Sequence, residues 1–331
     1  MSRLRIGLLF ELIGERPRRP EEPADADAEY EPESTIEALE AAVRELGHEP
    51  VRLGSPRALL ARAARGEGLG IDVALDIAEG ESTRNREAWA PVLLEMMGVP
   101  ALGSDALTLS LSLDKAWAKD VAAAAGVPTA PHASVESLAE AEAAAPRLGF
   151  PLFAKPRWEG TAKGIRRSSR VDSQEQLAGE VARLLRDYRQ PVLLEPFLPG
   201  PEYTVCVVGT PPRALPVLQR ALDRASGIGV HALAGEARDA GAAHAPGELS
   251  PALEQELAGH ARAAFEALRC RDFARADFKL DAAGRPRFLE INPLPTFATD
   301  GSFAILAELL GLSYAAFLAG VLAEGLRRLG L

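Results

Sequence analysis

Cysteine is scarce: Cys206 and Cys270 are the only two in 331 residues. Two cysteines cannot build a disulfide scaffold, so both are expected to be small buried side chains, and we predict a reducing, cytoplasmic location. Long apolar runs are also missing, since no segment reaches about eighteen consecutive apolar residues. The apolar run within MSRLRIGLLFELIGERP (1–17) is too short to be the hydrophobic region of a secretory signal. No membrane-spanning segment is therefore expected.

An excess of positive charge is absent as well. The chain has 37 Lys and Arg against 47 Asp and Glu, for a net charge of -10. Such a chain is not expected to bind nucleic acid as its main partner, although local basic pockets for phosphates remain compatible with it. Hydrophobic residues make up 47% and charged residues 25%, which is typical of a globular protein. The length predicts two or three domains.

Strands and helices are expected to alternate in the first part of the chain. Strands are predicted at 3–10, 49–53 and 72–77, and helices at 34–46, 57–65 and 89–97. This alternation predicts a parallel sheet wound with helices. Residues 15–32, rich in Pro, Glu, Arg and Asp, are expected to form a surface loop.

A polar segment, DIAEGESTRNRE at 76–87, follows the third predicted strand. Open α/β sheets bind ligands at the carboxyl ends of their strands. Glu79, Glu81 and Arg84 are therefore candidate substrate-binding residues. A polar loop without such a role explains the segment equally well.

The middle of the chain offers candidate phosphate-binding groups. A helix predicted at 113–125 carries Lys115 and Lys119 one turn apart, and a strand at 149–155 ends at Lys155. The loop RWEGTAKG (157–164) follows, and its glycines and small residues can bring backbone N–H groups to a phosphate. Its spacing differs from that of the Walker loop.

The remaining elements are expected as follows. A hairpin partner is predicted at 166–171, strands at 190–197 and 202–208, and helices at 174–188, 251–268 and 314–329. Residues 215–250 are rich in Gly and Ala, and a loop of this length inside a compact protein is usually functional or disordered.

A hairpin at 275–292 carries the most informative polar pattern. In the first strand Arg275, Asp277 and Lys279 share one face, because side chains alternate. Glu290 and Asn292 share a face of the second strand. Pairing of the strands would bring together two carboxylates, an amide and a guanidinium, a set of hard oxygen ligands that suits Mg²⁺. A solvated hairpin face is the alternative.

Five stretches in this order resemble the D-alanine–D-alanine ligases of the ATP-grasp superfamily. They are EMMGVPALGSDALTLSLSLDK (95–115), GVPTAP (126–131), GFPLFAKPRWEGTAKG (149–164), LLEPFLPGPEYTV (193–205) and the run RADFKLD to FLEINPLP (275–295). The resemblance covers nearly the whole chain. It implies an α/β (α+β) ATP-grasp fold of three domains: an N-terminal open parallel α/β sheet (1–103), a central lid-like α+β domain (104–194) and a C-terminal α+β domain with an antiparallel sheet (195–331).

The resemblance also implies roles for individual residues. Lys115 and Lys155 would neutralise nucleotide phosphates, and Arg275 would face the transferred phosphate as the catalytic cation. The other implied ATP-binding residues are the lid residues Glu159, Gly160, Thr161, Ala162 and Gly164, the adenine-clamp residues Glu195, Phe197 and Leu198, and the ribose ligand Glu202. The implied metal ligands are Asp277, Glu290 and Asn292, and the implied substrate residues are Pro295, Thr296 and Ser302.

The activity implied is ATP-dependent ligation of a carboxylate to an amine through an acyl phosphate, giving a peptide bond. ATP and two Mg²⁺ ions are the implied cofactors, with Mn²⁺ as a substitute, and amino acids or small carboxylates are the substrates. Peptidoglycan biosynthesis is the implied pathway. A homodimer is expected only as the commonest oligomer.

Departures from the family pattern gather at the amino-acid end. The usual N-terminal Gly-Gly-Ser-Glu loop is replaced by FELIGERPRRPEEP, in which Glu11 or Glu15 could substitute. The loop at 226–247 lacks the family's Tyr and Lys, so the basic candidates are Arg220, Arg224 and Arg238. Another amino acid or small carboxylate therefore stays open as the substrate. A catalytically inactive ATP-binding regulator is the alternative from a different class.

Overall fold

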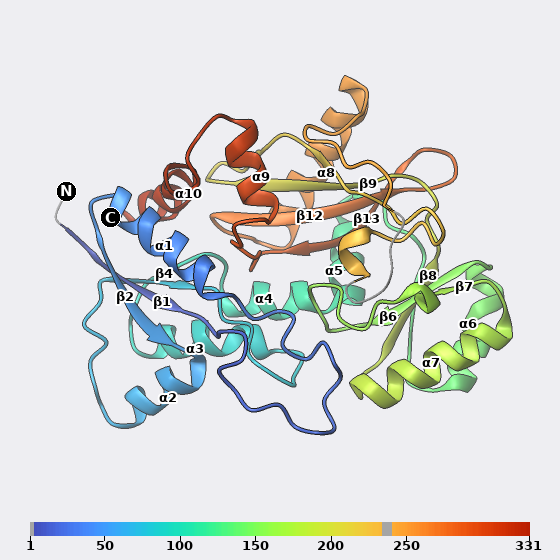
Figure 1. Ribbon diagram of the computed structural model, residues 1–331, viewed down its shortest axis with the longest axis horizontal. Helices are drawn as coiled ribbons and strands as arrows, with labels where there is room; N and C mark the ends of the chain where they lie inside the picture. Colours follow the sequence, from blue (N-terminus) through green and yellow to red (C-terminus); the bar gives the residue numbers. More distant parts are fainter. Residues whose placement is uncertain (1–2, 234–239) are drawn as a thin grey trace.

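The computed structural model describes residues 3–233 and 240–331, which form three sheets (Figure 1). The N-terminal sheet is parallel and has the order β2-β1-β3-β4. Its strands are β1 (Arg5–Leu9), β2 (Glu49–Gly54), β3 (Val73–Asp76) and β4 (Ala101–Leu102). Its helices are α1 (Glu33–Glu45), α2 (Pro56–Ala64) and α3 (Trp89–Met96), the last preceded by a 3-10 turn, η1 (Arg86–Ala88). The predicted parallel sheet is confirmed.

The central sheet is antiparallel and has the order β5-β8-β6-β7. Its strands are β5 (Ala133–Val135), β6 (Leu152–Pro156), β7 (Arg170–Val171) and β8 (Val192–Pro196). The segments that connect these strands contain α6 (Leu138–Leu148), the 3-10 turn η2 (Arg167–Ser169) and α7 (Gln174–Tyr188). Ser137 and Ser173 accept hydrogen bonds from the first turns of α6 and α7, a common way to start a helix. The sequence pattern had missed β5 and α6.

The C-terminal sheet runs β10-β9-β12-β13, and β11 also pairs with β9. Its strands are β9 (Glu202–Val208), β10 (Arg213–Ala214), β11 (Leu218–Gln219), β12 (Phe273–Leu280) and β13 (Pro286–Asn292). The predicted hairpin is confirmed, with Asp277 opposite Glu290 and Arg275 opposite Asn292. A bulge follows Asp277, so that Phe278 pairs with Phe288 and Leu289 is the extra residue.

The predicted helix at 113–125 is confirmed as α5 (Lys115–Ala124), and a helix that was not predicted, α4 (Ala106–Leu113), precedes it. Asp114 separates them because its backbone is extended, and its side chain accepts a hydrogen bond from Trp117 N at the start of α5. Ala118 and Ala122 of α5 pack in one core with Phe278 of the C-terminal sheet and with α8 (Pro251–Ala267). By packing, α5 therefore joins the C-terminal sheet.

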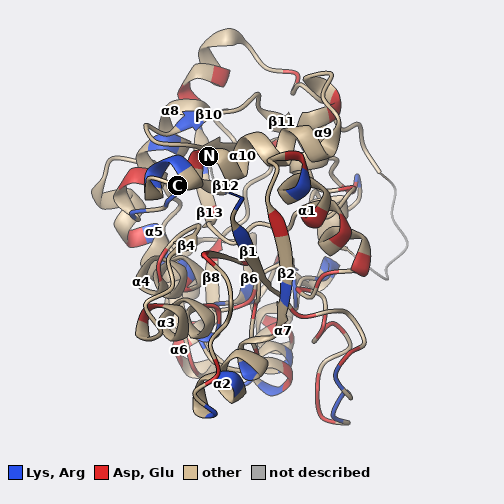
Figure 2. Ribbon diagram, turned by 90° about the vertical axis from the view of Figure 1, so that its left-hand side faces the viewer, with Lys and Arg blue, Asp and Glu red and all other residues tan. Residues whose placement is uncertain are grey.

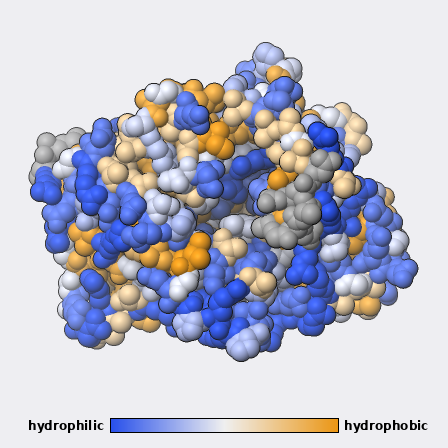
Figure 3. Space-filling view, viewed as in Figure 1, coloured by the Kyte–Doolittle hydropathy of each residue, from blue (hydrophilic) through white to orange (hydrophobic). Residues whose placement is uncertain are grey.

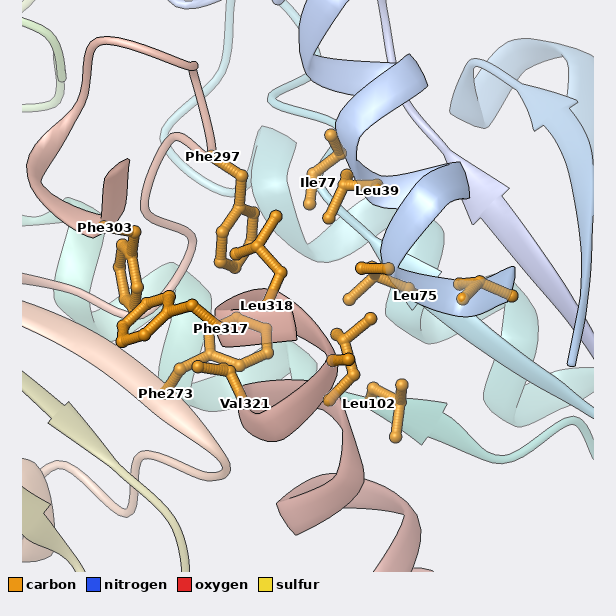
Figure 4. Close-up of a cluster of buried hydrophobic side chains, with 14 of the residues drawn as sticks. Leu39, Leu75, Ile77, Leu102, Phe273, Phe297, Phe303, Phe317, Leu318 and Val321 are labelled. Carbon is orange, nitrogen blue, oxygen red and sulfur yellow. The ribbon is translucent and has the colours of Figure 1, made fainter. Parts of the chain in front are cut away.

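Two closing helices tie the C-terminal sheet to the N-terminal one. These are α9 (Ser302–Leu309), which the pattern had missed, and α10 (Tyr314–Leu329). Figure 4 shows the resulting core, in which Phe273, Phe297 and Phe303 meet Leu39 and other N-terminal leucines. Phe297 lies 5.2 Å from both of the other aromatic rings. This shared core fixes the two regions against each other.

The surface matches the expectations from composition. Lys and Arg are interspersed with Asp and Glu over the face in Figure 2, and hydrophobic residues lie in small groups among hydrophilic ones in Figure 3. Within the described residues, no single helix is long and apolar enough to cross a membrane. Cys206 and Cys270 are buried free thiols, as predicted.

Residues 15–32 differ from the expected surface loop at their far end. They form no regular helix or strand, but Glu29, Tyr30 and Glu31 are buried. Leu12 bridges to Glu31, so the ends of the loop are held together. The loop lies against the central domain, and its carboxylates bind the predicted phosphate loop, as described below.

Candidate active site

A cavity of about 310 Å³ is lined by residues of the central and C-terminal sheets. Most of the predicted site residues line it. They are Lys115, Lys155, Glu159, Thr161, Ala162, Glu195, Phe197, Leu198, Glu202, Arg275, Asp277, Glu290, Thr296 and Ser302. The other predicted site residues do not line it: Glu79, Glu81, Arg84, Gly160, Gly164, Asn292 and Pro295.

Glu195 is fully enclosed between two lysines. Its carboxylate oxygens lie 2.8 Å from Lys155 Nζ and 2.8 Å from Lys119 Nζ. Burial raises the pKa of Glu195, but Lys119 and Lys155 outweigh burial and hold the pKa at about 2. Lys119 also donates to the carbonyl of Phe288 at 2.8 Å. Glu195 thus orients the lysines, and its predicted contact with adenine stays a prediction.

Lys115 links the metal-ligand candidates to the phosphate loop. Its Nζ lies 3.3 Å from Glu290 Oε2 and also donates to the carbonyl of Glu159. Burial raises the pKa of Glu290, and Lys115, Lys155 and Arg275 lower it to about 2. Glu290 is therefore an ionised carboxylate at neutral pH.

Asp277 and Glu290 face each other across β12 and β13. Asp277 Oδ1 accepts from Thr204 Oγ1 at 2.7 Å, and its Oδ2 accepts from Arg275 Nε at 3.0 Å. Asn292 Oδ1 accepts from Leu294 N at 2.9 Å, which orients its amide oxygen. Among the described residues no cluster of three or more His, Cys, Asp or Glu could hold a metal. Two facing carboxylates still fit Mg²⁺, which commonly takes one or two carboxylates and completes its shell with water and phosphates.

The loop at 157–164 is bent by unusual backbone conformations. Thr161 and Ala162 have φ values of 45° and 58°, and Gly164 has a φ of 79°. A Cβ on Gly164 would lie 2.6 Å from Pro156 Cγ, so this position requires glycine. Residues other than glycine that have a left-handed backbone conformation are strained, and they often mark ligand-binding loops.

Carboxylates from the N-terminal loop hold this loop from its other side. Glu29 Oε1 accepts from Gly160 N at 2.6 Å, and Glu29 Oε2 accepts from Lys163 Nζ at 2.9 Å. Asp25 accepts from Gly164 N at 2.8 Å. Arg86 adds a contact of 2.6 Å to Glu29. Burial raises the pKa of Glu29, and Arg86 and Lys163 lower it to about 2.

Glu202, the predicted ribose ligand, lies at another part of the cavity wall. Its carboxylate is 3.4 Å from Lys279 Nζ and 3.6 Å from His231 Nε2. Lys279 also donates to the carbonyl of Gly227 at 2.7 Å. Lys279 Nζ lies over the Phe197 ring, 5.8 Å from the ring centroid.

The structure does not bring Glu79, Glu81 and Arg84 to the cavity. Glu81 pairs with Arg57 Nε at 2.9 Å, and Arg84 stacks on Trp117 at 4.8 Å. Burial and the neighbouring carboxylate of Glu87 raise the pKa of Glu79, and burial and the carboxylate of Glu29 raise that of Glu87 to about 7. Their substrate role stays a prediction without a contact to support it.

The N-terminal loop glutamates give no clear replacement for the family's amino-acid ligand. Glu11 Oε2 accepts from the backbone N–H groups of Glu79 and Gly80, so it supports the loop after β3. Glu15 is exposed, and neither residue lines the cavity.

Arg220 does line the cavity. Its Nε donates to Thr204 Oγ1 at 2.9 Å, and one terminal nitrogen donates to Ser302 Oγ at 2.7 Å. Arg224 does not line the cavity, and Arg238 lies outside the described residues.

Lys119, Lys163 and Lys279 were noticed in the sequence without being given a role. Lys119 is 0% exposed, and a lysine within the alanine stripe of a helix could have signalled this, since the buried Ala116 and Ala122, three residues to either side, share its face. Lys163 lies in the phosphate loop, and Lys279 shares a strand face with Arg275 and Asp277. Strand and helix periodicity therefore contained the signal for two of the three.

The family model described as D-ala D-ala ligase C-terminus matches residues 121–323. A D-alanine–D-alanine ligase of Ectopseudomonas mendocina is 34% identical, over 72% of this chain and 73% of that protein. An uncharacterized protein, y4sG, of Sinorhizobium fredii is 31% identical, over 88% and 87% of the two chains.

Solved structures share the fold over nearly the whole chain. The VanG D-Ala:D-Ser ligase of Enterococcus faecalis has a TM-score of 0.75 at 17% identity, covering 97% of this chain and 99% of the other. A Bacillus anthracis D-alanine–D-alanine ligase complexed with ATP has a TM-score of 0.72 at 21% identity, covering 98% of each. At these identities the likeness establishes the ATP-grasp fold.

Proposed function

The chain belongs to the D-alanine–D-alanine ligase family, and on this premise we propose that it is an ATP-dependent ligase that joins a carboxylate to an amine. The observation that carries the proposal is the convergence of two kinds of group in one cavity. Lys115 and Lys155 come from α5 and the central sheet, and Arg275, Asp277 and Glu290 come from the C-terminal hairpin. Lysines suit phosphates, and facing carboxylates suit a divalent cation.

The reaction proceeds in two steps. A substrate carboxylate attacks the γ-phosphate of ATP, giving an acyl phosphate and ADP. An amine then attacks the acyl carbon, and phosphate leaves. Lys115, Lys155 and Arg275 stabilise the phosphoryl charge by position and field, so that no protein nucleophile is needed.

Magnesium is the proposed metal, held by Asp277, Glu290 and Asn292, with Mn²⁺ as a substitute. When bound, it supplies positive charge to the phosphate oxygens. Two ions are expected from the family. The donor set supports this assignment, since Glu290 is ionised and Asp277 keeps lone pairs beyond its two hydrogen bonds.

The loop at 159–164 is proposed to cover the β- and γ-phosphates. Its left-handed residues and the N-terminal carboxylates that hold Gly160 and Gly164 support this role. Phe197, Leu198 and Glu202 are proposed to bind the nucleoside. The division at 103 and 194 stays a prediction, with α5 packing on the C-terminal sheet.

D-Alanine is the first substrate to test, since the named relatives are D-alanine–D-alanine ligases. A ligase of the same mechanism for another amino acid is the second candidate, favoured by the different residues at 226–247 and by Thr296, which stands where the family pattern has Gly. Peptidoglycan biosynthesis, a cytoplasmic location and a homodimer remain predictions.

The test is to incubate the protein with ATP, Mg²⁺ and separate pools of D- and L-amino acids, and to measure ADP and phosphate. ADP release that depends on D-alanine alone supports the first candidate. Release with other amino acids only would favour the second. ATP binding without turnover in any pool would contradict the ligase proposal and favour the inactive regulator.

A further inference from the structure

The side chain of Asp114 is buried between α5 and the loop at 157–164, where three donors meet it. Asp114 is 1% exposed. Its Oδ1 accepts from Arg157 Nε at 2.7 Å and from Trp117 N at 3.2 Å, and its Oδ2 accepts from Trp158 Nε1 at 3.0 Å. One of these donors belongs to the first turn of α5, and the other two begin the loop. Asp114 therefore joins the helix to the loop, although it lies outside the lining of the cavity.

The residues that follow Asp114 and Trp158 both line the cavity. Lys115, next to Asp114, donates from its backbone N to the carbonyl of Arg157 at 3.2 Å, and its Nζ donates to the carbonyl of Glu159. Lys115 is thus bonded to the loop through both its main chain and its side chain. Because the carboxylate of Asp114 binds the two residues before Glu159, it keeps the loop aligned with Lys115.

This joint connects two parts of the molecule. The helix α5 packs on the C-terminal sheet, whereas the loop lies between β6 and β7 of the central sheet. On the central side, Gln190 Oε1 accepts from Trp158 N at 2.6 Å, and Gln190 Nε2 donates to Glu159 Oε1 at 2.6 Å. Asp114 binds the same stretch from α5. The start of the loop is therefore held between a carboxylate of one part and an amide of the other.

The contacts of Asp114 depend on its being a carboxylate. A carboxylate can accept from all three donors, whereas an asparagine has one accepting oxygen and an NH2 group that would face one of the donors. The pairing of Asp114 with Arg157 also compensates for burial, since their side chains are 1% and 14% exposed. Asparagine at this position would keep the shape, remove the charge beside Arg157 and leave one donor without its acceptor.

We propose that Asp114 is a positioning residue for phosphate binding: it holds Lys115 and the loop at 157–164 in the arrangement that receives the β- and γ-phosphates. This inference rests on the proposed ligase function, in which Lys115 and the loop bind these phosphates. Asp114 acts through them. A loop that is already in place loses less conformational freedom when ATP binds, so the nucleotide binds more tightly.

The test compares the affinities for ATP and AMP, because AMP lacks the two phosphates that the loop would cover. Dissociation constants are measured with Mg²⁺ and without amino acids, by calorimetry for ATP and by competition for AMP. In Asp114→Asn the affinity for ATP should fall about 10-fold, as expected for the loss of a charged hydrogen bond, while that for AMP should change less than about 2-fold. The ratio of the two affinities is the readout, since a general loss of stability would not change it.

A second variant isolates the bond to the loop. Trp158→Phe keeps an aromatic ring and the cap of α5, but it removes the indole N–H that binds Asp114 Oδ2. The ratio should fall about 3-fold in this variant, and amide exchange in the loop should become faster in both variants. If Asp114→Asn does not fold, Trp158→Phe decides the matter. An unchanged ratio in either folded variant would overturn the inference.

The matched control is Asp105→Asn. Asp105 caps α4 as Asp114 caps α5: its Oδ1 accepts from Thr108 N at 3.0 Å, and its Oδ2 lies 2.8 Å from Arg271 Nη2. These partners belong to α4 and to the segment before β12, so the ratio should stay as in the wild type. An equal fall in Asp105→Asn would overturn the inference, since it would trace the effect to the loss of a helix cap.

The wild type separates failure of this inference from failure of the proposed function. A wild-type protein that binds ATP no more tightly than AMP would contradict the phosphate site and with it the proposed function. A wild type that prefers ATP, together with variants that keep the same preference, would overturn only the role of Asp114. Because binding is measured without turnover, the result does not depend on which amino acids are joined.

Discussion

Glu195 in the cavity and Glu87 in the N-terminal domain are both buried, with 2% and 5% exposure, yet their charges are treated in opposite ways. Two lysines at 2.8 Å hold the pKa of Glu195 at about 2 against its burial. Burial and the neighbouring carboxylate of Glu29 raise the pKa of Glu87 to about 7, against the attraction of Arg86. Burial alone therefore does not set the charge of a carboxylate.

The difference has a functional meaning. Of the cations around Glu195 and Glu290, Lys115, Lys155 and Arg275 line the cavity, where the phosphates of the proposed nucleotide would share them, and Lys119 does not. Around Glu79 and Glu87 the gathered carboxylates are opposed by Arg86 and, at Glu87, by Lys115, and neither glutamate lines the cavity. Paired charges at a cavity suit ligand binding, whereas gathered carboxylates in a packed region lower stability at neutral pH.

The largest effect is expected from Glu290→Gln, at one of the carboxylates that are paired with cations at the cavity. This change removes the charge that pairs with Lys115 and one of the two facing carboxylates. ADP release in the presence of ATP, Mg²⁺ and the active amino acid should fall about 10³-fold, with the fold retained by circular dichroism. Glu308→Gln, on the exposed side of α9, is the control with unchanged turnover. A Glu290→Gln enzyme with normal turnover would remove the metal assignment.

Lys119→Met tests whether two cations are needed to keep buried Glu195 ionised, because it leaves Lys155 as the one lysine paired with Glu195. A buried carboxylate that loses one of its two cations should cost about 3 kcal/mol in the free energy of unfolding, measured by urea denaturation at pH 7. In the wild type the lowered pKa of Glu195 stabilises the fold above about pH 4.5. That stabilisation disappears as pH falls toward 2, so the difference from the variant should shrink in acid.

The control for Lys119→Met is Lys115→Met, which lies one turn away but faces the phosphate loop and Glu290. It should impair ATP turnover more than it impairs stability. Equal losses of stability in the two variants would mean that the enclosure of Glu195 is not special.

Sequence periodicity predicted the groups whose position depends on one element. The alternation of Arg275, Asp277 and Lys279 placed all three on the cavity face, and the strand end at Lys155 was found in the same way. The pairing of the two hairpin strands was predicted, but the bulge at Leu289 was not, because an inserted residue leaves no mark in a short alternating pattern.

Contacts between distant segments could not be predicted in this way. Lys119 meets Glu195, and Glu29 meets Gly160, across 76 and 131 residues of chain. The loop that carries Glu29 has the composition of a solvent-exposed segment, and Arg86, Lys163 and the N–H of Gly160 compensate for the burial of the Glu29 carboxylate. Local composition does not include such partners.

Glu87→Gln tests the unpaired side. Because the pKa of Glu87 is raised on folding, ionised Glu87 lowers the free energy of unfolding. This loss of stability is absent below about pH 4.5, grows as pH rises to about 7 and is constant above that. Glutamine carries no charge, so the variant should be more stable than the wild type by about 3 kcal/mol at pH 8 and show no gain at pH 4. Urea denaturation at both pH values measures this, with exposed Glu37→Gln as the control. An equal difference at the two pH values would contradict the assignment.

Glu29→Gln sharpens the comparison, because Glu29 comes from the N-terminal segment but is paired as the cavity carboxylates are. Its carboxylate pairs with Arg86 and Lys163, and its Oε1 also accepts a hydrogen bond from Gly160 N. The amide keeps the shape but not the charge, so the phosphate loop should be held less firmly in the position that covers ATP. The KM for ATP should rise about 10-fold, and amide exchange at 160–164 should become faster. Glu21→Gln, an exposed change in the same loop, should do neither. A higher KM without faster exchange would mean that Glu29 acts on the nucleotide through charge and does not hold the loop.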